Sequence, residues 1–271
     1  MRFASTTAVR RCARRALSLV ELLVVVAVVG VLLALLLPAV QSARGSARAA
    51  VCLQHLRQIG LGLQTYHATW KSFPPGGIEW RAGGNAKQRQ LAWSAFLLPF
   101  VEQQAVYSSL DLSQAYDSPA NAAGAATVLE VYLCPGAERA GPRVDGRGAC
   151  DYGGIYGERI TSPNQPPKGT MLYDRAIRLE HIKDGASRTL IVAEDSAWPD
   201  GQWINGRNIF DQSFPINQAP PFENDIRSHH PGGAQAALAD GSARFLNETI
   251  DLRVLAALCT RAGGETTGDF E

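Results

Sequence analysis

Two polar groups near the C-terminus have the residue types and spacing of a small binding site. His230 precedes a glycine-rich turn in SHHPGG, and nine residues separate it from an Asp240-Gly241 pair. A histidine and a carboxylate together can ligate a metal ion or hold a sugar hydroxyl. The more common roles are structural, because histidines often hydrogen-bond a neighbouring loop and Asp-Gly is a hairpin turn in its own right. Both interpretations stay open on the sequence alone.

The other titratable side chains form no recognisable catalytic set. His55, His67 and His181 stand singly, and Glu194-Asp195 is an acid pair at the end of an apolar run. The chain has no G-x-S-x-G nucleophile motif, no Cys-His motif and no phosphate-binding loop. We therefore expect no enzyme. Too few ligands are close in sequence to support a zinc site, so we assign no metal ligand.

The sequence predicts an α+β fold for the helices and strands that position these groups. Apolar residues recur at steps of three or four beyond Pro38, which is typical of one face of an amphipathic helix. An Asp-Gly pair between two apolar runs predicts a hairpin. The expected elements are a long helix over residues 17–66, a helix over 91–106 broken at a proline, strands at 128–133, 189–194, 234–238 and 243–246, and a last helix over 252–261.

Five scattered tryptophans lie in or beside the predicted loops. Together on a surface they would suit carbohydrate stacking, whereas singly they anchor a core, which is the usual case.

Residues 17–37 form an apolar run of 21 residues whose one charge is Glu21, long enough to cross a bilayer. The preceding residues 1–16 carry five arginines and no acid, which leaves 21 basic and 25 acidic residues in the rest. This asymmetry predicts a segment held on the cytoplasmic side of a membrane and argues against a nucleic-acid partner. A plain signal anchor, or a signal peptide cleaved near Ala43, is the alternative.

Glu21 is the unexpected residue, since an ionised side chain near the bilayer centre costs about 2.5–3.5 kcal/mol. Residues 16–25, ALSLVELLVV, resemble the type IV prepilin signal, in which a basic leader is followed by a mature chain whose fifth residue is glutamate. Pro38 matches a proline often found in pilin helices, whereas Ala16 stands where the family usually has glycine.

That resemblance implies cleavage between Ala16 and Leu17 by a prepilin peptidase and methylation of the new amino terminus. It also implies that Glu21 pairs with the α-amino group of a neighbouring subunit, which offsets the cost of the buried carboxylate.

The rest of the chain is similar to a large bacterial family of prepilin-type proteins with a C-terminal H-x9-DG domain, a family especially expanded in planctomycetes. The matching stretches are residues 52–77, LCPG at 133–136, DGASRTLIVAE at 184–194, residues 228–246 and RAGGE at 261–265. Some members are labelled type II secretion pseudopilins and others solute-binding proteins, so the resemblance implies no settled activity. Major pseudopilins carry calcium, but its ligands do not map onto this chain.

Loss of the leader with Cys12 would leave four cysteines, Cys52, Cys134, Cys150 and Cys259. An even number beyond the membrane is compatible with disulfides in an oxidising compartment. Cys52 and Cys134 lie in stretches shared with the family, so the resemblance favours that pair, which would link the long helix to the head. A local Cys134–Cys150 bridge and four free thiols remain open.

The expected organisation is a basic leader (1–16), a transmembrane segment (17–37), the periplasmic half of the long helix (38–70) and a globular head (71–271). The resemblance implies a pilin-like, single-pass subunit of the bacterial inner membrane, with a cytoplasmic N-terminus and a periplasmic head. Its partners would be the prepilin peptidase and other pilin-like subunits of a type II secretion or type IV pilus-like system. The alternative is a membrane-anchored solute- or glycan-binding module that does not polymerise.

Overall fold

The computed structural model describes residues 19–81, 85 and 88–265. The chain divides into two compact units, residues 1–44 and residues 45–271. The predicted leader, with the cleavage residues Ala16 and Leu17, lies outside the described residues.

The described part of the first unit is helical, and between Leu22 and Leu37 it is apolar on every side. It belongs to α1 (Leu19–Trp70), whose most apolar 18-residue window has a mean hydropathy of 3.1 and no buried residue. The large apolar side chains described between Leu19 and Leu37 are exposed. A helix that is apolar all round and has no protein packed on it is suited to hydrocarbon. The segment is therefore a candidate membrane span.

Within the second unit, α1 supplies one wall of the main core. Cys52, Leu56, Ile59 and Leu63 are buried at helical spacing. Val51 belongs to the apolar periodicity beyond Pro38, yet its side chain is 43% exposed and its neighbour Cys52 is buried. The helix ends at Trp70, shortly before the Pro74-Pro75 pair.

A five-stranded sheet in the order β5-β3-β4-β6-β7 forms the centre of the second unit. All its pairs are antiparallel except β3 with β5. The strands are β3 (Tyr152–Glu158), β4 (Leu190–Glu194), β5 (Ile209–Gln212), β6 (Gly233–Leu238) and β7 (Ala243–Asn247). The other elements are α2 (Trp93–Leu97), η2 (Leu98–Phe100), α3 (Gln104–Ser108), α4 (Ala122–Ala125), η3 (Glu130–Tyr132), β1 (Arg143–Val144), β2 (Arg147–Gly148), η4 (Leu179–His181), η5 (Ala186–Arg188) and α5 (Leu252–Leu258).

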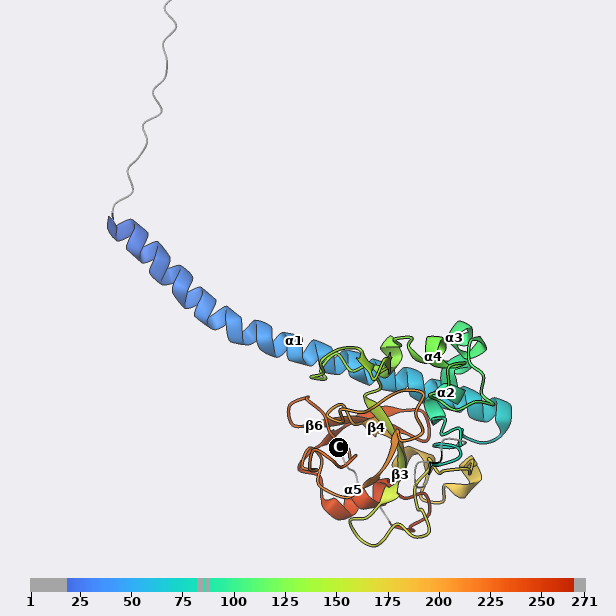
Figure 1. Ribbon diagram of the computed structural model, residues 1–271. Coiled ribbons are helices and arrows are strands. Elements are labelled where there is room, and N and C mark those ends of the chain that lie inside the picture. Colours follow the sequence, from blue (N-terminus) through green and yellow to red (C-terminus); the bar gives the residue numbers. More distant parts are fainter. Residues whose placement is uncertain (1–18, 82–84, 86–87, 266–271) are drawn as a thin grey trace, which may run out of the picture. The chain divides into compact units, whose positions relative to one another are not determined.

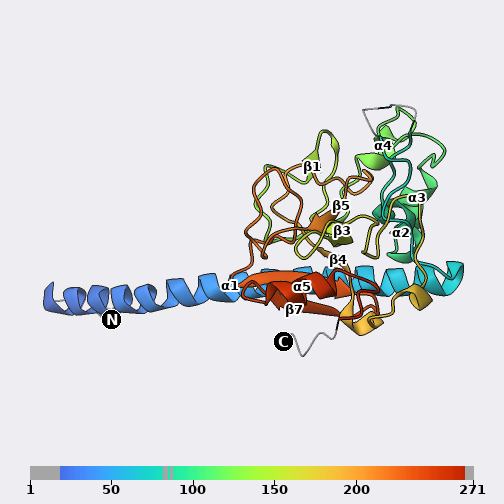
Figure 2. The same cartoon turned by 90° about the horizontal axis from the view of Figure 1, so that it is seen from below.

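Both faces of the sheet are covered (Figures 1 and 2). Ile191 of β4 belongs to the same buried cluster as Leu56 of α1. Leu190 belongs to a second cluster with Leu255 of α5. Double-sided burial explains why every residue of β4 and β6 is buried, including the polar residues Glu194 and Gln235.

The β6–β7 hairpin docks its turn on α1. Gly241 has a φ of 88°, a conformation that glycine adopts freely. A Cβ on Gly60 of α1 would lie 2.5 Å from the carbonyl oxygen of Gly241. Beside this contact Gln64 Nε2 donates to Ala239 O at 2.5 Å. The Asp-Gly pair thus forms a turn that also touches the long helix.

We expect Gly60→Ala to lower the free energy of unfolding by about 1–3 kcal/mol, because its methyl group would overpack two backbones. Gly45, on the same helix, has nothing within 4 Å of an added Cβ. Gly45→Ala should therefore raise stability by about 0.5–1 kcal/mol through helix propensity alone. Urea unfolding of the full chain in detergent, followed by tryptophan fluorescence, measures both. Similar effects from the two changes would contradict the close contact.

Several expected elements differ from the structure. The expected strand at 128–133 is wrong, because the segment forms η3, and the last helix ends at Leu258, three residues early. Two strands of this sheet, the inner strand β3 and the edge strand β5, were not predicted. The helix broken at a proline appears as α2 followed by η2, with Pro99 in η2.

Candidate functional site

The two predicted assembly residues both lie on α1. Glu21 is exposed in its first turn, and Pro38 is exposed within the helix. Glu21 is the one charged residue between Leu19 and Leu37. The carboxylate therefore sits at the N-terminal end of the helix, where the helix dipole favours negative charge.

His230 and Asp240 do not form a common site. They flank β6 at opposite ends, and their side chains contact different residues. Asp240 Oδ1 accepts hydrogen bonds from Ser242 N at 2.9 Å and Ser242 Oγ at 2.6 Å, which closes the hairpin turn. Of the two interpretations left open by the sequence, the structure therefore favours the structural one for Asp240, as a turn residue.

His230 is instead one of four residues in a buried group, which we call the Cys–Glu–His cluster: Cys52, Cys134, Glu194 and His230. Its Nε2 lies 3.2 Å from Glu194 Oε1 and 3.3 Å from Cys134 Sγ. The exposed fraction is 5% for His230 and 0% for the other three residues. The structure therefore gathers the histidine of one predicted motif, a glutamate of another and two cysteines.

A disulfide joins Cys52 to Cys134, with the two Cα atoms 5.1 Å apart. It links α1 to the loop that follows η3, across a sequence separation of 82 residues. Cys150 and Cys259 are buried free thiols. Burial raises the pKa of the Cys150 thiol to about 12, so it stays protonated and unreactive near neutral pH.

Separate elements hold the cluster in place. Glu194 ends β4, and its Oε2 accepts a hydrogen bond from Gln235 N of β6 at 2.7 Å. A Cβ on Gly136 would lie 2.6 Å from Cε1 of His230, so the glycine of LCPG leaves room for the imidazole ring. These contacts hold the side chains of Glu194 and His230 in fixed positions within the cluster.

An ion pair supports the loop around Cys134. Asp151 Oδ2 accepts a hydrogen bond from Cys134 N at 2.5 Å and pairs with Arg139, which also donates to Cys134 O at 3.0 Å. Burial raises the pKa of Asp151 to about 6, although the Arg139 guanidinium opposes the shift. The carboxylate is thus kept ionised at neutral pH by its arginine partner.

The remaining predicted residues act singly. Asp195 pairs with Arg227 at 3.2 Å rather than with Glu194. His55 Nδ1 lies 2.9 Å from Leu133 O, and His67 Nε2 accepts from Leu179 N at 3.3 Å. His181 is half-buried in η4, where its Nδ1 accepts a hydrogen bond from Arg178 N at 3.2 Å. These side chains fix local backbone and carry no common chemistry.

The nitrogen and sulfur donors of the cluster do not suit calcium, which takes oxygen ligands. They suit zinc, which takes cysteine thiolates, histidine and carboxylates, provided that the sulfurs are thiolates.

A second carboxyl group gives the head a predictable pH response. Asp225 is fully buried, and burial raises its pKa to about 7, although Ser213 N donates to Oδ2 at 3.0 Å. An unfolded aspartate titrates near ~3.9, so between those pH values the folded chain keeps a proton that the unfolded chain releases. The stability from this group is complete below about pH 4 and is lost as the pH rises through the folded-state pKa.

We therefore expect the free energy of unfolding of the wild type to decrease as the pH rises from about 4.5 to 7. This decrease should be steeper than that of Asp225→Asn by up to ~1.4 kcal/mol per pH unit. Urea unfolding at several pH values compares the two chains. Equal slopes would contradict the raised pKa of Asp225.

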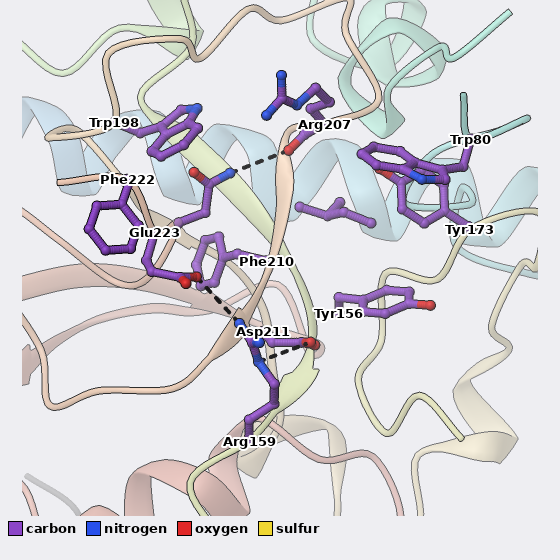
Figure 3. Close-up of a pocket in the computed structure, with 12 residues that line it drawn as sticks. Trp80, Tyr156, Arg159, Tyr173, Trp198, Arg207, Phe210, Asp211, Phe222 and Glu223 are labelled. Atoms are coloured by element: carbon purple, nitrogen blue, oxygen red, sulfur yellow. Dashed lines mark hydrogen bonds and ion pairs between the residues drawn. The ribbon is translucent and has the colours of Figure 1, made fainter. Parts of the chain in front are cut away.

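Six aromatic side chains gather around a pocket of about 440 Å³ on the head (Figure 3). These aromatic pocket residues are Trp80, Tyr156, Tyr173, Trp198, Phe210 and Phe222. Tyr173 packs against Trp80 and Tyr156 with ring centroids 5.0 and 5.8 Å apart. Phe222 and Trp80 are 76% and 41% exposed, so part of the aromatic surface of the pocket faces solvent.

Polar groups of both charges line the same pocket. Arg159 pairs with Asp211 at 3.5 Å and with Glu223 at 3.4 Å, as Figure 3 shows. Asn224 Nδ2 donates to Arg207 O at 3.4 Å, whereas its buried Oδ1 has no hydrogen-bond partner among the described residues. An apolar pocket with a few convergent polar groups is the usual form of a small-molecule site.

The sequence could not have predicted this pocket, because its residues come from six separated stretches of the chain. The tryptophans themselves were a partial signal. Trp93 and Trp203 are fully buried core residues, as single tryptophans usually are, whereas Trp80 and Trp198 reach the pocket.

Comparison with known proteins identifies a family but no activity. No curated protein and no solved structure matches the chain. A family model described as "Protein of unknown function (DUF1559)" matches residues 41–208 and 202–253, which include the Cys–Glu–His cluster and the aromatic pocket. Because the match covers well over half of the 271 residues, the chain belongs to this family of proteins of unknown function.

Proposed function

We propose that the protein is a membrane-anchored, pilin-like structural subunit that assembles through its N-terminal helix. The observation that carries this proposal is the composition of α1. One helix of 52 residues contains a fully exposed apolar stretch and a later stretch that forms core in the head. A helix whose only role was to pack against the head would not need an exposed apolar N-terminal stretch.

The presence of Glu21 favours a helix that assembles with other subunits over a helix that only anchors the head in the membrane. A carboxylate within a membrane helix is costly alone, but it becomes favourable beside a positive group. Cleavage after Ala16 would place a new α-amino group at Leu17, four residues from Glu21 in sequence. In an assembly, this amino group of one subunit would pair with Glu21 of its neighbour and so set their register.

The proposed topology follows from the leader. Its arginines would stay in the cytoplasm, and the head would face the periplasm of the inner membrane. The partners would be a prepilin peptidase and other pilin-like subunits. A type II secretion or type IV pilus-like machine fits these properties, and the subunit would have no enzymatic activity of its own.

Two differently tagged copies of the chain, expressed together in the native cell, test the proposal. After cross-linking in membranes, we expect each tag to retrieve the other copy as a ladder of multimers. Recovery of monomers alone, with the head folded and the membrane intact, would refute assembly.

The aromatic pocket favours a second candidate, a membrane-anchored module that binds a glycan and does not polymerise. Sugar rings stack on exposed aromatic faces, and carboxylate, amide and guanidinium groups can bind their hydroxyls. The pocket offers both, with Phe222 and Trp80 exposed and Asn224 Oδ1 without a partner among the described residues. Its volume of about 440 Å³ falls within the range of small-ligand sites.

A panel of neutral disaccharides and trisaccharides, titrated calorimetrically into the full chain in detergent, tests this candidate. We expect Trp80→Ala and Phe222→Ala each to weaken binding about tenfold, which corresponds to about 1.4 kcal/mol. Trp70→Ala is the matched control, since Trp70 is also exposed, at 62%, but lies outside the pocket. No binding, or equal loss in all three variants, would contradict a glycan site.

A further inference from the structure

The Cys–Glu–His cluster places four potential metal ligands in one buried space. The donor atoms of Cys52, Cys134, Glu194 and His230 all lie within 4.8 Å of one another. Zinc bonds of about 2.0–2.3 Å in a tetrahedron place ligand atoms roughly 3.3–3.8 Å apart. The distances between the four donor atoms are therefore close to those of a tetrahedral zinc site. Only the two sulfur atoms must move further apart, once the bond between them is broken.

A second, independent observation also favours a cation at this position. Glu194 is fully buried, and its Oε1 has no hydrogen-bond partner among the described residues. His230 Nε2 lies 3.2 Å away, but the contact does not have hydrogen-bond geometry. Nε2 thus faces a carboxylate oxygen and a cysteine sulfur, and all three atoms can donate electron pairs to a metal. A buried carboxylate oxygen without a donor is costly unless a cation binds it.

We propose that the cluster binds one Zn²⁺ ion once a thiol or phosphine reductant has supplied the two electrons, and water the two protons, that convert the Cys52–Cys134 disulfide to two thiols, and that the disulfide form binds no metal. Binding releases the two thiol protons and forms two zinc–sulfur bonds, with Glu194 Oε1 and His230 Nε2 as the other ligands. Disulfide sulfurs carry no such charge and do not replace thiolates as ligands.

The surroundings of the cluster suit a metal site. The second oxygen of Glu194 is held by Gln235 N at 2.7 Å, which orients the first oxygen toward the cluster. Asp151 and Arg139 hold the backbone on both sides of Cys134. Gly136 leaves space for the His230 ring. The ligands are therefore positioned by the fold before a metal arrives.

Cobalt titration of the full chain in detergent tests the proposal. A phosphine reduces the disulfide under anaerobic conditions, taking up the oxygen of one water molecule as phosphine oxide and leaving two thiols. We expect the reduced chain to bind one Co²⁺ with the intense visible bands of tetrahedral thiolate coordination. Stoichiometric Zn²⁺ should remove these bands, and the disulfide form should show none.

Four variants show whether the predicted ligands are responsible. We expect Glu194→Gln to weaken Co²⁺ binding at least tenfold and His230→Ala at least a hundredfold. Cys259→Ala and His181→Ala are matched controls outside the cluster and should leave affinity unchanged.

Absence of thiolate bands in the reduced wild-type chain would overturn the proposal, whether or not the chain stays folded. Equal affinity in wild type, Glu194→Gln and His230→Ala would also overturn it, since that is the result for adventitious binding by two thiols. The measurement is independent of subunit assembly.

Discussion

Replacing Glu21 with alanine should abolish incorporation of the subunit into multimers. The change removes the carboxylate that the neighbouring α-amino group needs, while it makes the apolar segment a better membrane anchor. We expect recovery of a differently tagged partner after cross-linking to fall at least tenfold. The amount of chain in the membrane fraction should stay the same. Glu21→Gln should fail equally, because the amide keeps the shape but not the charge.

Gln41→Ala is the control for this prediction, because Gln41 is another exposed polar residue of α1. It should leave multimers intact. Multimers that persist in Glu21→Ala would show that the helix associates without the ion pair. The glycan-binding candidate predicts no effect of Glu21 on ligand capture, so a combined assay separates the two functions.

Loss of the Cys52–Cys134 disulfide should have the largest effect on the stability of the head. The bridge closes a loop with a sequence separation of 82 residues, for which the chain-entropy model gives ~4.5 kcal/mol. We expect Cys52→Ala/Cys134→Ala to lose about this amount of unfolding free energy, as measured by urea unfolding of the full chain in detergent. Reduction by a phosphine should destabilise the wild type in the same way but leave the double variant unchanged.

Cys259→Ala provides the comparison, because Cys259 is equally buried but free. Its loss should cost about 1 kcal/mol, the value of a small apolar contact. A similar cost for the double variant would mean that the bridge contributes little. Zinc added to reduced wild-type chain should restore part of the stability, since a ligand that binds only the folded state stabilises it.

The sequence predicted the elements with strong local signals. The long helix, β4 and the β6–β7 hairpin each have a clear apolar period or an Asp-Gly turn. The strand β3 was missed because YGGIYGE contains three glycines and has the composition of a loop. The segment at 128–133 has an apolar composition, but its burial comes from η3 packing into the core rather than from sheet pairing.

The candidate site, like the fold, was predicted from the sequence only in part. Sequence reasoning considered His230 together with Asp240, because the two residues belong to one H-x9-DG motif. In β6 that spacing crosses the whole strand, so the two side chains lie at its opposite ends. The partners of His230 come from α1, the loop after η3 and the end of β4. Only the strand register and the docking of α1 bring them together, and neither has a local sequence signal.

The central claim, that this chain is processed and assembled like a pilin, depends most directly on its mature N-terminus. Mass spectrometry of the N-terminal peptide from membranes of the native cell measures it. The account predicts a peptide that begins with N-methylated Leu17. A peptide that begins with Met1, or one that begins beyond Ala43, would contradict processing and favour a plain anchor or a secreted head.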